Sequence, residues 1–456
     1  MKFEIDEQSI RDLEIFSTYK NSKSVFSVFD FTFFKGGRDK LYSFLSKPLT
    51  DLEQIVQRRD SIAFFQGILP MDLKTIDKDA IGFTDFYLKQ VRSSAEMPSF
   101  AIYLSKLWNE INPSREFFTI ENGAKSAIAF LKSLYEYATA LSEKLSGANP
   151  PQSLAEKHRK VMDIFATQEF KSLLRLKKPT VYAAFKYDYF FRKVYRSELK
   201  FLIELVYEYD AYIAAAKAAQ EHGFCYPDFS SPGEKRLQVE ELFHPFLENA
   251  VPSSVELGDG RNLLFVSGPN MAGKSTFLKA LGIATYLAHT GLPVPAKKMN
   301  LNLLTGISAT VNIADDLNSG YSHFYAEVVR IKKVVDKLQS NNNMLVIFDE
   351  LFRGTNVKDA YDGTMAITSA FAKIKTSFFV ISSHIVEVAK NFEDKGSIRL
   401  GYFEVLQKNA TPQYTYLLKE GVSDVRLGMY IIRKERLIEN IESIIETTNK
   451  HKIQTK

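Results

Sequence analysis

The residues with the clearest chemical pattern lie between Gly268 and Thr276, in the segment GPNMAGKST. Four residues separate Gly268 from Gly273, Lys274 and Ser275, which is the spacing of a phosphate-binding loop. Glycines let the backbone turn tightly, so that several N–H groups face one anion. Lys274 would then reach the outer phosphates of a nucleotide, and the Ser275 hydroxyl would hold Mg²⁺.

The elements around this segment must position it. An apolar run at 263–266 precedes the loop, and a helical pattern that includes Phe277, Leu278 and Leu281 follows it. A helix that starts at the loop directs its positive end at the same phosphates. A glycine-rich turn between two core elements is the alternative, and the strand before and helix after favour the phosphate loop.

A second apolar run, 344–348, ends in Asp349 and Glu350. A strand with this ending places both carboxylates at the carboxyl edge of the sheet, beside the first loop. Asp349 would hold Mg²⁺ through water, and Glu350 would orient and polarise the attacking water. The alternative is that the two acids only cap the next turn. His384 follows another apolar run, and the sequence leaves open whether it senses the γ-phosphate or is an ordinary polar residue at a strand end.

Length and composition limit the class of protein in which these motifs occur. The chain has 456 residues, a length that suits two or three domains, and 36 Phe within a 45% hydrophobic content can fill sizeable cores. The net charge of +5 permits a nucleic-acid partner without demanding one. Cys225 is the single cysteine, so no internal disulfide forms, and we expect a cytoplasmic protein. The acidic, amphipathic start is unlike a signal peptide, and no apolar run has the length of a membrane span.

The predicted secondary structure changes near residue 233, from helices alone to alternating strands and helices. Residues 1–24 are predicted to be a polar lead-in with at most one helix. Residues 25–232 show helical periodicity at about 101–112, 122–146, 153–175 and 195–221, and almost no period-two alternation. From 233 to 433, strands at 263–267, 344–348 and 377–382 alternate with helices, and further strands are expected at 400–418. A helix closes the chain within 434–456. The predicted fold class is therefore all-helical followed by α/β.

The helical part contains a basic stretch at residues 171–200, with nine Lys or Arg against two acids. Tyr and Phe residues interleave with these cations, as in grooves that bind nucleic acid. A solvated helix face whose aromatic stripe lies in the core explains the same pattern. The candidate DNA contacts are basic throughout: Lys171, Arg175, Lys177, Lys178, Arg192, Lys193 and Arg196.

Taken together, several segments resemble the MutS family of DNA mismatch-repair ATPases, which are relatives of the ABC-type ATPases. The segments are LFHP at 242–245, GPNMAGKST, TGLPVPA at 290–296, ADDLNSGYSHFYAE at 314–327, FDELFRGTNVKDA at 348–360, SSH at 382–384 and EGVSDVRLG at 420–428. Asp30, Gly37, Leu41 and Pro48 also resemble the start of the family's helical core, or lever, domain.

The resemblance implies roles for individual residues. ATP would be bound by Gly268, Pro269, Asn270, Met271, Ala272, Gly273, Lys274, Ser275 and Thr276, with Mg²⁺ on Ser275 and Asp349. Catalysis would involve Glu350, His384 and Asn270. Ser319, Gly320 and Ser322 would serve the ATP of a partner subunit, whereas unaided they indicate only a polar turn and a helix N-cap. Family members hold adenine between two rings. Tyr416 matches one of them, and Ala250 and Val251 offer no ring at the other.

The departures from the family are informative as well. Only about 25 residues precede the lever-like region, so we expect no mismatch-reading domain there. The expected function is an ATP-driven, DNA-binding homodimer, with ATP and Mg²⁺ as cofactors and double-stranded or branched DNA and a repair protein as partners. The alternative is an ATP-switched scaffold whose helical half binds a protein and no DNA.

Overall fold

The computed structural model describes residues 2–17, 22–90, 98–112, 114–177, 180–231, 234–258, 260–311, 323–341, 343–352, 354–393, 395–408, 411–423 and 432–454. The chain forms two compact units. The nucleotide unit comprises residues 1–18, 227–286 and 295–456, and the helical unit comprises 19–226 and 287–294. The predicted combination of helical and mixed α/β structure is confirmed. Within the described part of the chain, no helix is both long and apolar enough to cross a membrane.

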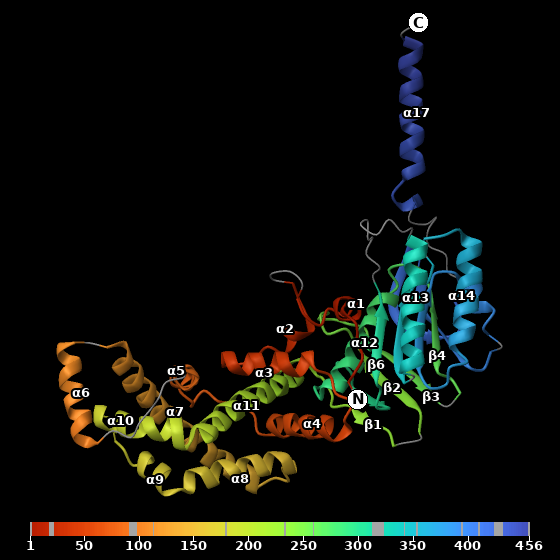
Figure 1. Ribbon diagram of the computed structural model, residues 1–456. Helices are drawn as coiled ribbons and strands as arrows, with labels where there is room; N and C mark the ends of the chain where they lie inside the picture. The colour runs from red at the N-terminus through yellow and green to blue at the C-terminus, as the bar shows by residue number, and fades with distance from the viewer. Residues whose placement is uncertain are drawn as a thin grey trace. The chain divides into compact units, whose positions relative to one another are not determined.

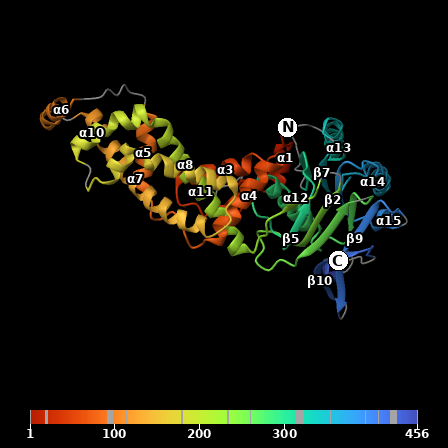
Figure 2. The same ribbon diagram turned by 90° about the horizontal axis from the view of Figure 1, so that it is seen from below.

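The helical unit consists of helices joined by short connections (Figures 1 and 2). Its helices are α2 (Val25–Phe29), α3 (Lys35–Ser46), α4 (Leu52–Gly67), α5 (Lys78–Lys89), α6 (Ser99–Ile111), α7 (Arg115–Ser146), α8 (Gln152–Ala166), α9 (Gln168–Leu174), α10 (Val181–Tyr189) and α11 (Arg196–His222), with a π-helical turn η1 (Phe190–Val194) before α11.

The long helix α11 is the centre of this unit and packs against α3, α4 and α5. Buried alanines line its second half, and such small side chains let neighbouring helices approach closely. Asp210 of α11 accepts hydrogen bonds from the backbone N–H groups of Phe33 and Phe34, and therefore fixes the chain directly before α3. A Cβ on Gly37 would lie 2.0 Å from Asp210 Oδ2, so only glycine fits at that crossing.

The nucleotide unit contains two sheets. The six-stranded sheet has the order β10-β9-β4-β8-β7-β6 and is parallel except for the β9–β10 hairpin; the smaller sheet has the order β1-β5-β2-β3. The strands are β1 (Asp228–Phe229), β2 (Arg236–Leu242), β3 (Ser253–Gly258), β4 (Leu263–Ser267), β5 (Lys298–Leu301), β6 (Gly306–Thr310), β7 (Met344–Asp349), β8 (Phe378–Ser383), β9 (Ile398–Lys408) and β10 (Thr411–Glu420). Its helices are α1 (Glu7–Asp12), α12 (Lys274–Thr290), α13 (His323–Ser340), α14 (Val357–Phe371), α15 (Val386–Lys390) and α17 (Leu437–Gln454).

The central strands are apolar throughout because both faces of the large sheet are covered. Alternate residues such as Phe265, Val346 and Phe379 form one core with α13, α14 and α15. On the opposite face α12 packs against β7, where a Cβ on Gly282 would lie 3.2 Å from Ile347. The two layers fix β4, β7 and β8 side by side, and with them the residues that follow each strand.

The structure differs from the sequence expectations at three places. Residues 2–17 are not a separate lead-in, because they pack within the nucleotide unit. Residues 287–294 group with the helical unit although they lie inside the stretch expected to be the ATPase domain. The small sheet and β6 were not predicted, since these strands are short and one of them, β2, carries several charged residues. The closing helix is present as α17.

Candidate nucleotide-binding site

The glycine loop connects β4 to α12 in the predicted strand–loop–helix order. Gly268 and Gly273 have φ angles of 139° and 110°, a region of backbone space that glycine adopts without strain. Met271, between them, also has a positive φ of 66°. The loop is therefore strongly curved, and Asn270 and Met271 are exposed on its outer side.

Lys274 is folded back onto this loop. Its Nζ donates to the carbonyl oxygens of Gly268 at 2.8 Å and Pro269 at 3.0 Å, and lies 3.6 Å from Glu350 Oε1. Its side chain is only 4% exposed. A buried ammonium group held against the carbonyl oxygens of a glycine loop is suited to bind the outer phosphates of a nucleotide.

Asp349, at the end of β7, lies directly beside the start of α12. Its Oδ2 accepts a hydrogen bond from the Ser275 hydroxyl, and its Oδ1 accepts one from the Ser382 hydroxyl. A hydroxyl and a carboxylate are hard oxygen ligands of the kind that Mg²⁺ uses together with substrate phosphates. Among the described residues no group of three or more His, Cys, Asp or Glu is placed to hold a metal ion.

Glu350 is held in place by its own backbone. Its φ is 57°, an uncommon conformation for a residue with a side chain, and its N–H donates to Ser382 O at 3.2 Å and Oγ at 3.1 Å. These bonds direct the carboxylate towards Lys274. His384 Nδ1 lies 3.5 Å from Glu350 Oε2, and the His384 side chain is 53% exposed. The three strand ends therefore place Lys274, Asp349, Glu350 and His384 together.

A cavity of about 420 Å³ opens beside the loop. Met271 and Gly273 to Phe277 form one side of it, and Tyr416 lies against Gly273, where a Cβ would be 3.4 Å from its ring. Ala250 and Val251 also line the cavity, as expected from their sequence position, together with aromatic residues.

Three further rings line this cavity, from Phe243, His244 and Phe403. Burial and the nearby Lys279 lower the pKa of His244 to about 4, so its ring is neutral at pH 7. The cavity therefore offers more rings than the single Tyr416 expected from the sequence. Both residues lie in the segment LFHP at 242–245, which indicated only the family resemblance in the sequence and not a source of rings.

The residues predicted to act in a partner subunit, Ser319, Gly320 and Ser322, lie outside the described residues, as do Asp315 and Asp316. The structure describes the elements on both sides of them, β6 and α13.

The predicted DNA contacts do not form one set. Lys171, Arg175, Lys177 and Lys193 are exposed, and Lys178 lies outside the described residues. Arg192 is a correction, because it is buried and bound to Asp188 through Nε at 2.8 Å and Nη2 at 2.7 Å. Arg196 is half-buried and donates to the carbonyl oxygen of Leu88 at 3.0 Å.

Three of the seven interleaved aromatic residues belong to the core as well. Phe185, Tyr187 and Phe191 are buried, and Tyr182 is the ring that is largely exposed. The basic and aromatic pattern thus combines two signals. Arg192 and three of the rings are buried among the helices, whereas the exposed cations are Lys171, Arg175, Lys177, Lys186, Lys193 and Lys200.

The strand–loop–helix geometry, the buried lysine and the neighbouring acidic strand define an α/β domain with a phosphate-binding loop. Residues 264–455 match the family model described as MutS domain V.

Similar proteins carry the same family name. The chain is 30% identical over 268 residues to the DNA mismatch repair protein MutS of Bacillus licheniformis, an alignment that covers 56% of this chain and 30% of that protein. The MutS of Persephonella marina is 27% identical over 312 residues, covering 64% of this chain and 34% of its own. The MutS of Petrotoga mobilis is 22% identical over 512 residues, which covers 94% of this chain and 62% of the relative. The chain thus spans about a third of the length of the first two relatives.

Proposed function

We propose that this chain is a MutS-type ATPase that binds ATP and Mg²⁺ at the loop between β4 and α12 and uses slow hydrolysis to switch a DNA-binding conformation. The observation that carries this proposal is the convergence of Lys274, Ser275, Asp349 and Glu350 at adjacent strand ends. Each has the chemistry that phosphoryl transfer to water requires.

We assign each of these residues a role that its position supports. The loop N–H groups and Lys274 bind the β- and γ-phosphates, and Ser275 and Asp349 hold Mg²⁺, which neutralises phosphate charge when bound. Glu350 accepts a hydrogen bond from the attacking water and raises the electron density on its oxygen. His384, whose Nδ1 lies 3.5 Å from Glu350 Oε2, is proposed to sense the γ-phosphate. Asn270 faces outward from the loop and is proposed to reach the phosphates from there.

Adenine is proposed to occupy the cavity beside Gly273. Tyr416 and Phe243 supply rings from opposite parts of the chain, and Phe403 closes the apolar wall. Stacking on aromatic faces is worth about 1–3 kcal/mol per base. With two rings available, a purine should bind more tightly than with the single ring expected from the sequence.

The active form is proposed to be a homodimer with two composite ATP sites. Ser319, Gly320 and Ser322 would complete the site of the partner. Helix α17 supports dimer formation, because Leu437, Ile438, Ile441, Ile444 and Ile445 are all 46–66% exposed at helical spacing of three and four residues. Such a stripe is the pattern that pairs helices.

DNA is proposed to bind the helical unit through Lys171, Arg175, Lys177 and Lys193. Glu169 and Phe170 of α9 contact Tyr195, so the exposed cations come from adjoining elements. Phosphate contacts of this kind carry no sequence information, and we expect mismatched and matched duplexes to bind within about tenfold of each other, or 1.4 kcal/mol.

A protein-binding scaffold is the second candidate, and one observation favours it. Helix α6 exposes an apolar stripe of Phe100, Tyr103, Trp108 and Ile111, each at least 61% exposed. Patches of this kind mark protein contacts. Filter binding to homoduplex, mismatched, branched and single-stranded DNA over a salt series separates the two candidates. Affinity that falls steeply with salt supports DNA binding, and no DNA binding at low salt supports the scaffold.

Two substitutions test the ATPase itself. Lys274→Ala removes the cation that faces the phosphates, so ATP binding should be lost. Glu350→Gln keeps the shape of the side chain and removes its charge, so ATP should still bind while kcat falls by about 100-fold or more. Wild-type turnover by Glu350→Gln would show that another group activates the water.

A further inference from the structure

A second cavity, of about 270 Å³, lies in the nucleotide unit away from the phosphate-binding loop. Its lining comes from the start of β2, the end of β3, the turn that leads into β4 and the start of β9. The phosphate-binding loop follows the other end of β4, and the five residues of this strand span roughly 16 Å. The second cavity is therefore separate from the proposed nucleotide site.

Basic side chains dominate the lining of the second cavity. The charged residues among its described lining are Lys235, Arg236, Arg261 and Arg399, with Glu234 and Glu256 opposing them. Four cations and two carboxylates give this lining a formal charge of +2. A recess with an excess of positive charge attracts anions.

The neighbouring carboxylates hold the arginines only loosely. The two ion pairs of Arg236 measure 3.3 Å to Glu234 Oε1 and 3.6 Å to Glu256 Oε1. Arg399 Nε lies 3.8 Å from Glu420 Oε1. Hydrogen bonds between charged groups are usually shorter, at about 2.7–2.9 Å. An oxyanion in the cavity can therefore make closer bonds to these guanidinium groups than the carboxylates do.

Lys235 carries a desolvated ammonium group at this cavity. Its Nζ is shielded from solvent and has no hydrogen-bond partner among the described residues. The nearest compensation is the face of the Phe378 ring, whose centre lies 5.0 Å from Nζ. Burial and the nearby Lys375 lower the pKa of Lys235 to about 8. A bound anion would offset both effects, because it supplies the missing opposite charge.

The backbone around the cavity is fixed before any ligand binds. Arg236 pairs with Gly258 where β2 and β3 meet, and a Cβ on Gly258 would lie 2.5 Å from Lys235 O. Gly258 and Arg261 exchange both backbone hydrogen bonds, at 3.1 and 2.7 Å, and so close the turn between β3 and β4. Arg399 Nη1 donates to Glu256 O at 2.8 Å, which holds the fourth cation beside β3. Less ordering is then required on binding.

We propose that the second cavity binds one phosphate monoester group, with Lys235, Arg236 and Arg399 as its ligands. The dianion matches the charge of the lining, and planar guanidinium groups suit phosphate oxygens. The volume is below the range of about 300–1,000 Å³ that is typical of sites for larger ligands, so a phosphate group fits better than a whole nucleotide. Small phosphorylated molecules and the 5′-phosphate of a DNA end share this group. The proposal does not depend on the ATPase assignment, because the two cavities share no lining residue.

Calorimetric titration of the full-length Lys274→Ala chain with inorganic phosphate tests the proposal. This background removes the cation of the phosphate-binding loop, so phosphate bound there does not obscure the result. Three charge-assisted contacts at about tenfold each correspond to one phosphate per chain with a Kd of about 1 mM. Lys235→Met keeps the length of the side chain and removes its charge, and Arg399→Gln removes a guanidinium group. Each should weaken phosphate binding by about tenfold or more.

A matched control separates this site from a general effect of charge. Lys333→Met removes the same charge from an exposed position on α13 and should leave the Kd within about twofold. Thermal unfolding is measured for every variant with and without phosphate. Phosphate should raise the unfolding midpoint of the parent and of the Lys333 variant, but much less that of the two cavity variants. If Lys235→Met unfolds below the assay temperature, Arg399→Gln supplies the comparison.

The source of the phosphate group is tested by competition. A 5′-phosphorylated single-stranded oligonucleotide that displaces phosphate, while its 5′-hydroxyl counterpart does not, assigns the site to DNA ends. Displacement by neither assigns it to small phosphorylated molecules. Equal displacement by both indicates binding of backbone diesters and overturns the monoester assignment. Absence of saturable binding at ten times the expected Kd overturns the site itself, as does an affinity that the two cavity variants leave unchanged or that Lys333→Met lowers equally.

Discussion

Replacing Arg192 by alanine should unfold the helical unit at much lower denaturant than the wild-type chain. Arg192 and Asp188 form a two-bond ion pair within one helical turn, and each side chain is only 8% exposed. The Tyr87 hydroxyl also donates to Asp188, and burial together with that carboxylate raises the pKa of Tyr87. Truncation would leave a buried carboxylate whose remaining side-chain partner is a neutral phenol.

The size of the effect follows from this geometry. Removing one partner of a buried ion pair costs about 3–5 kcal/mol, because the remaining charge stays desolvated. The Tyr87 bond persists, which places the expected loss near the lower limit, at about 3 kcal/mol. Lys193→Ala, at the next position and exposed, should change stability by no more than about 0.5 kcal/mol.

Urea unfolding followed by far-UV circular dichroism measures the difference, because the helical unit consists of helices and its unfolding removes their signal. With an m-value of about 2 kcal/mol/M, the midpoint of Arg192→Ala should fall by about 1.5 M. The double variant with Asp188→Ala should lose less than the sum of the two single variants. Equal midpoints for Arg192→Ala and Lys193→Ala would refute the structural role.

Three further outcomes are expected. Tyr416→Ala and Phe243→Ala should each weaken ATP binding by about 1–3 kcal/mol in titration calorimetry, and an unchanged affinity in both would remove adenine from that cavity. Burial lowers the pKa of His289 to about 4. Because the unfolded chain binds a proton at this residue near pH 6.5, the free energy of unfolding should be independent of His289 above that pH and should fall by about 3 kcal/mol as the pH drops towards 4. His289→Gln should flatten that part of a pH series of urea midpoints. Gly37→Ala should lower the unfolding free energy by about 1–3 kcal/mol through contact with Asp210, and a neutral result would mean that the crossing can widen.

Local motifs were accessible from the sequence because covalent spacing determines their geometry. A strand, a glycine loop and a helix in succession bring Lys274 and Ser275 to the loop without help from distant residues. Asp349 was predictable for a related reason, since parallel neighbouring strands share one carboxyl edge. The alternating apolar and helical segments likewise indicated the α/β class, which the mixed sheets confirm.

Side-chain burial could not be predicted from the sequence, because it depends on which distant segment covers a side chain. Arg192 and Lys193 are adjacent and equally basic, yet contact with Tyr87, more than 100 residues earlier, makes one structural and leaves the other exposed. Phe243 and Tyr416 line one cavity although 173 positions separate them.

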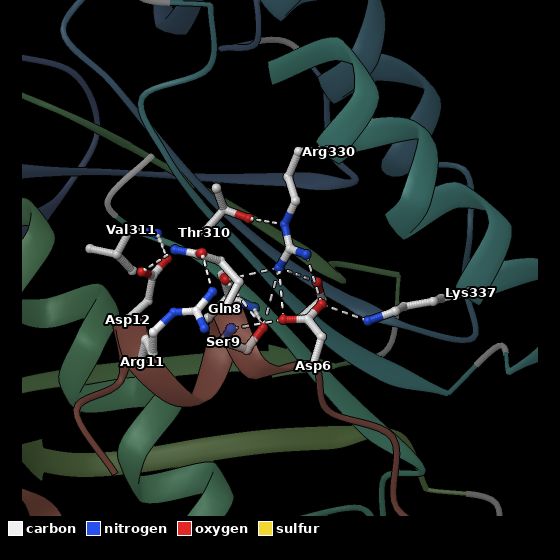
Figure 3. Close-up of polar contacts among 11 residues, drawn as sticks. Asp6, Gln8, Ser9, Arg11, Asp12, Thr310, Val311, Arg330 and Lys337 are labelled. Carbon is white, nitrogen blue, oxygen red and sulfur yellow. Dashed lines mark hydrogen bonds and ion pairs between the residues drawn. The ribbon is translucent and has the colours of Figure 1, made fainter. Parts of the chain in front are cut away.

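The N-terminal segment shows the same limit most clearly. Its Ser9 and Asp12 look like ordinary polar residues of a short helix, and Asp6 like its cap. Each of these side chains finds its partner about 300 residues away, on β6 or α13 (Figure 3). The bonds of Ser9 and Asp12 form because an edge strand leaves backbone groups without a neighbouring strand, and only the folded sheet determines which strand lies at the edge and which segment covers it.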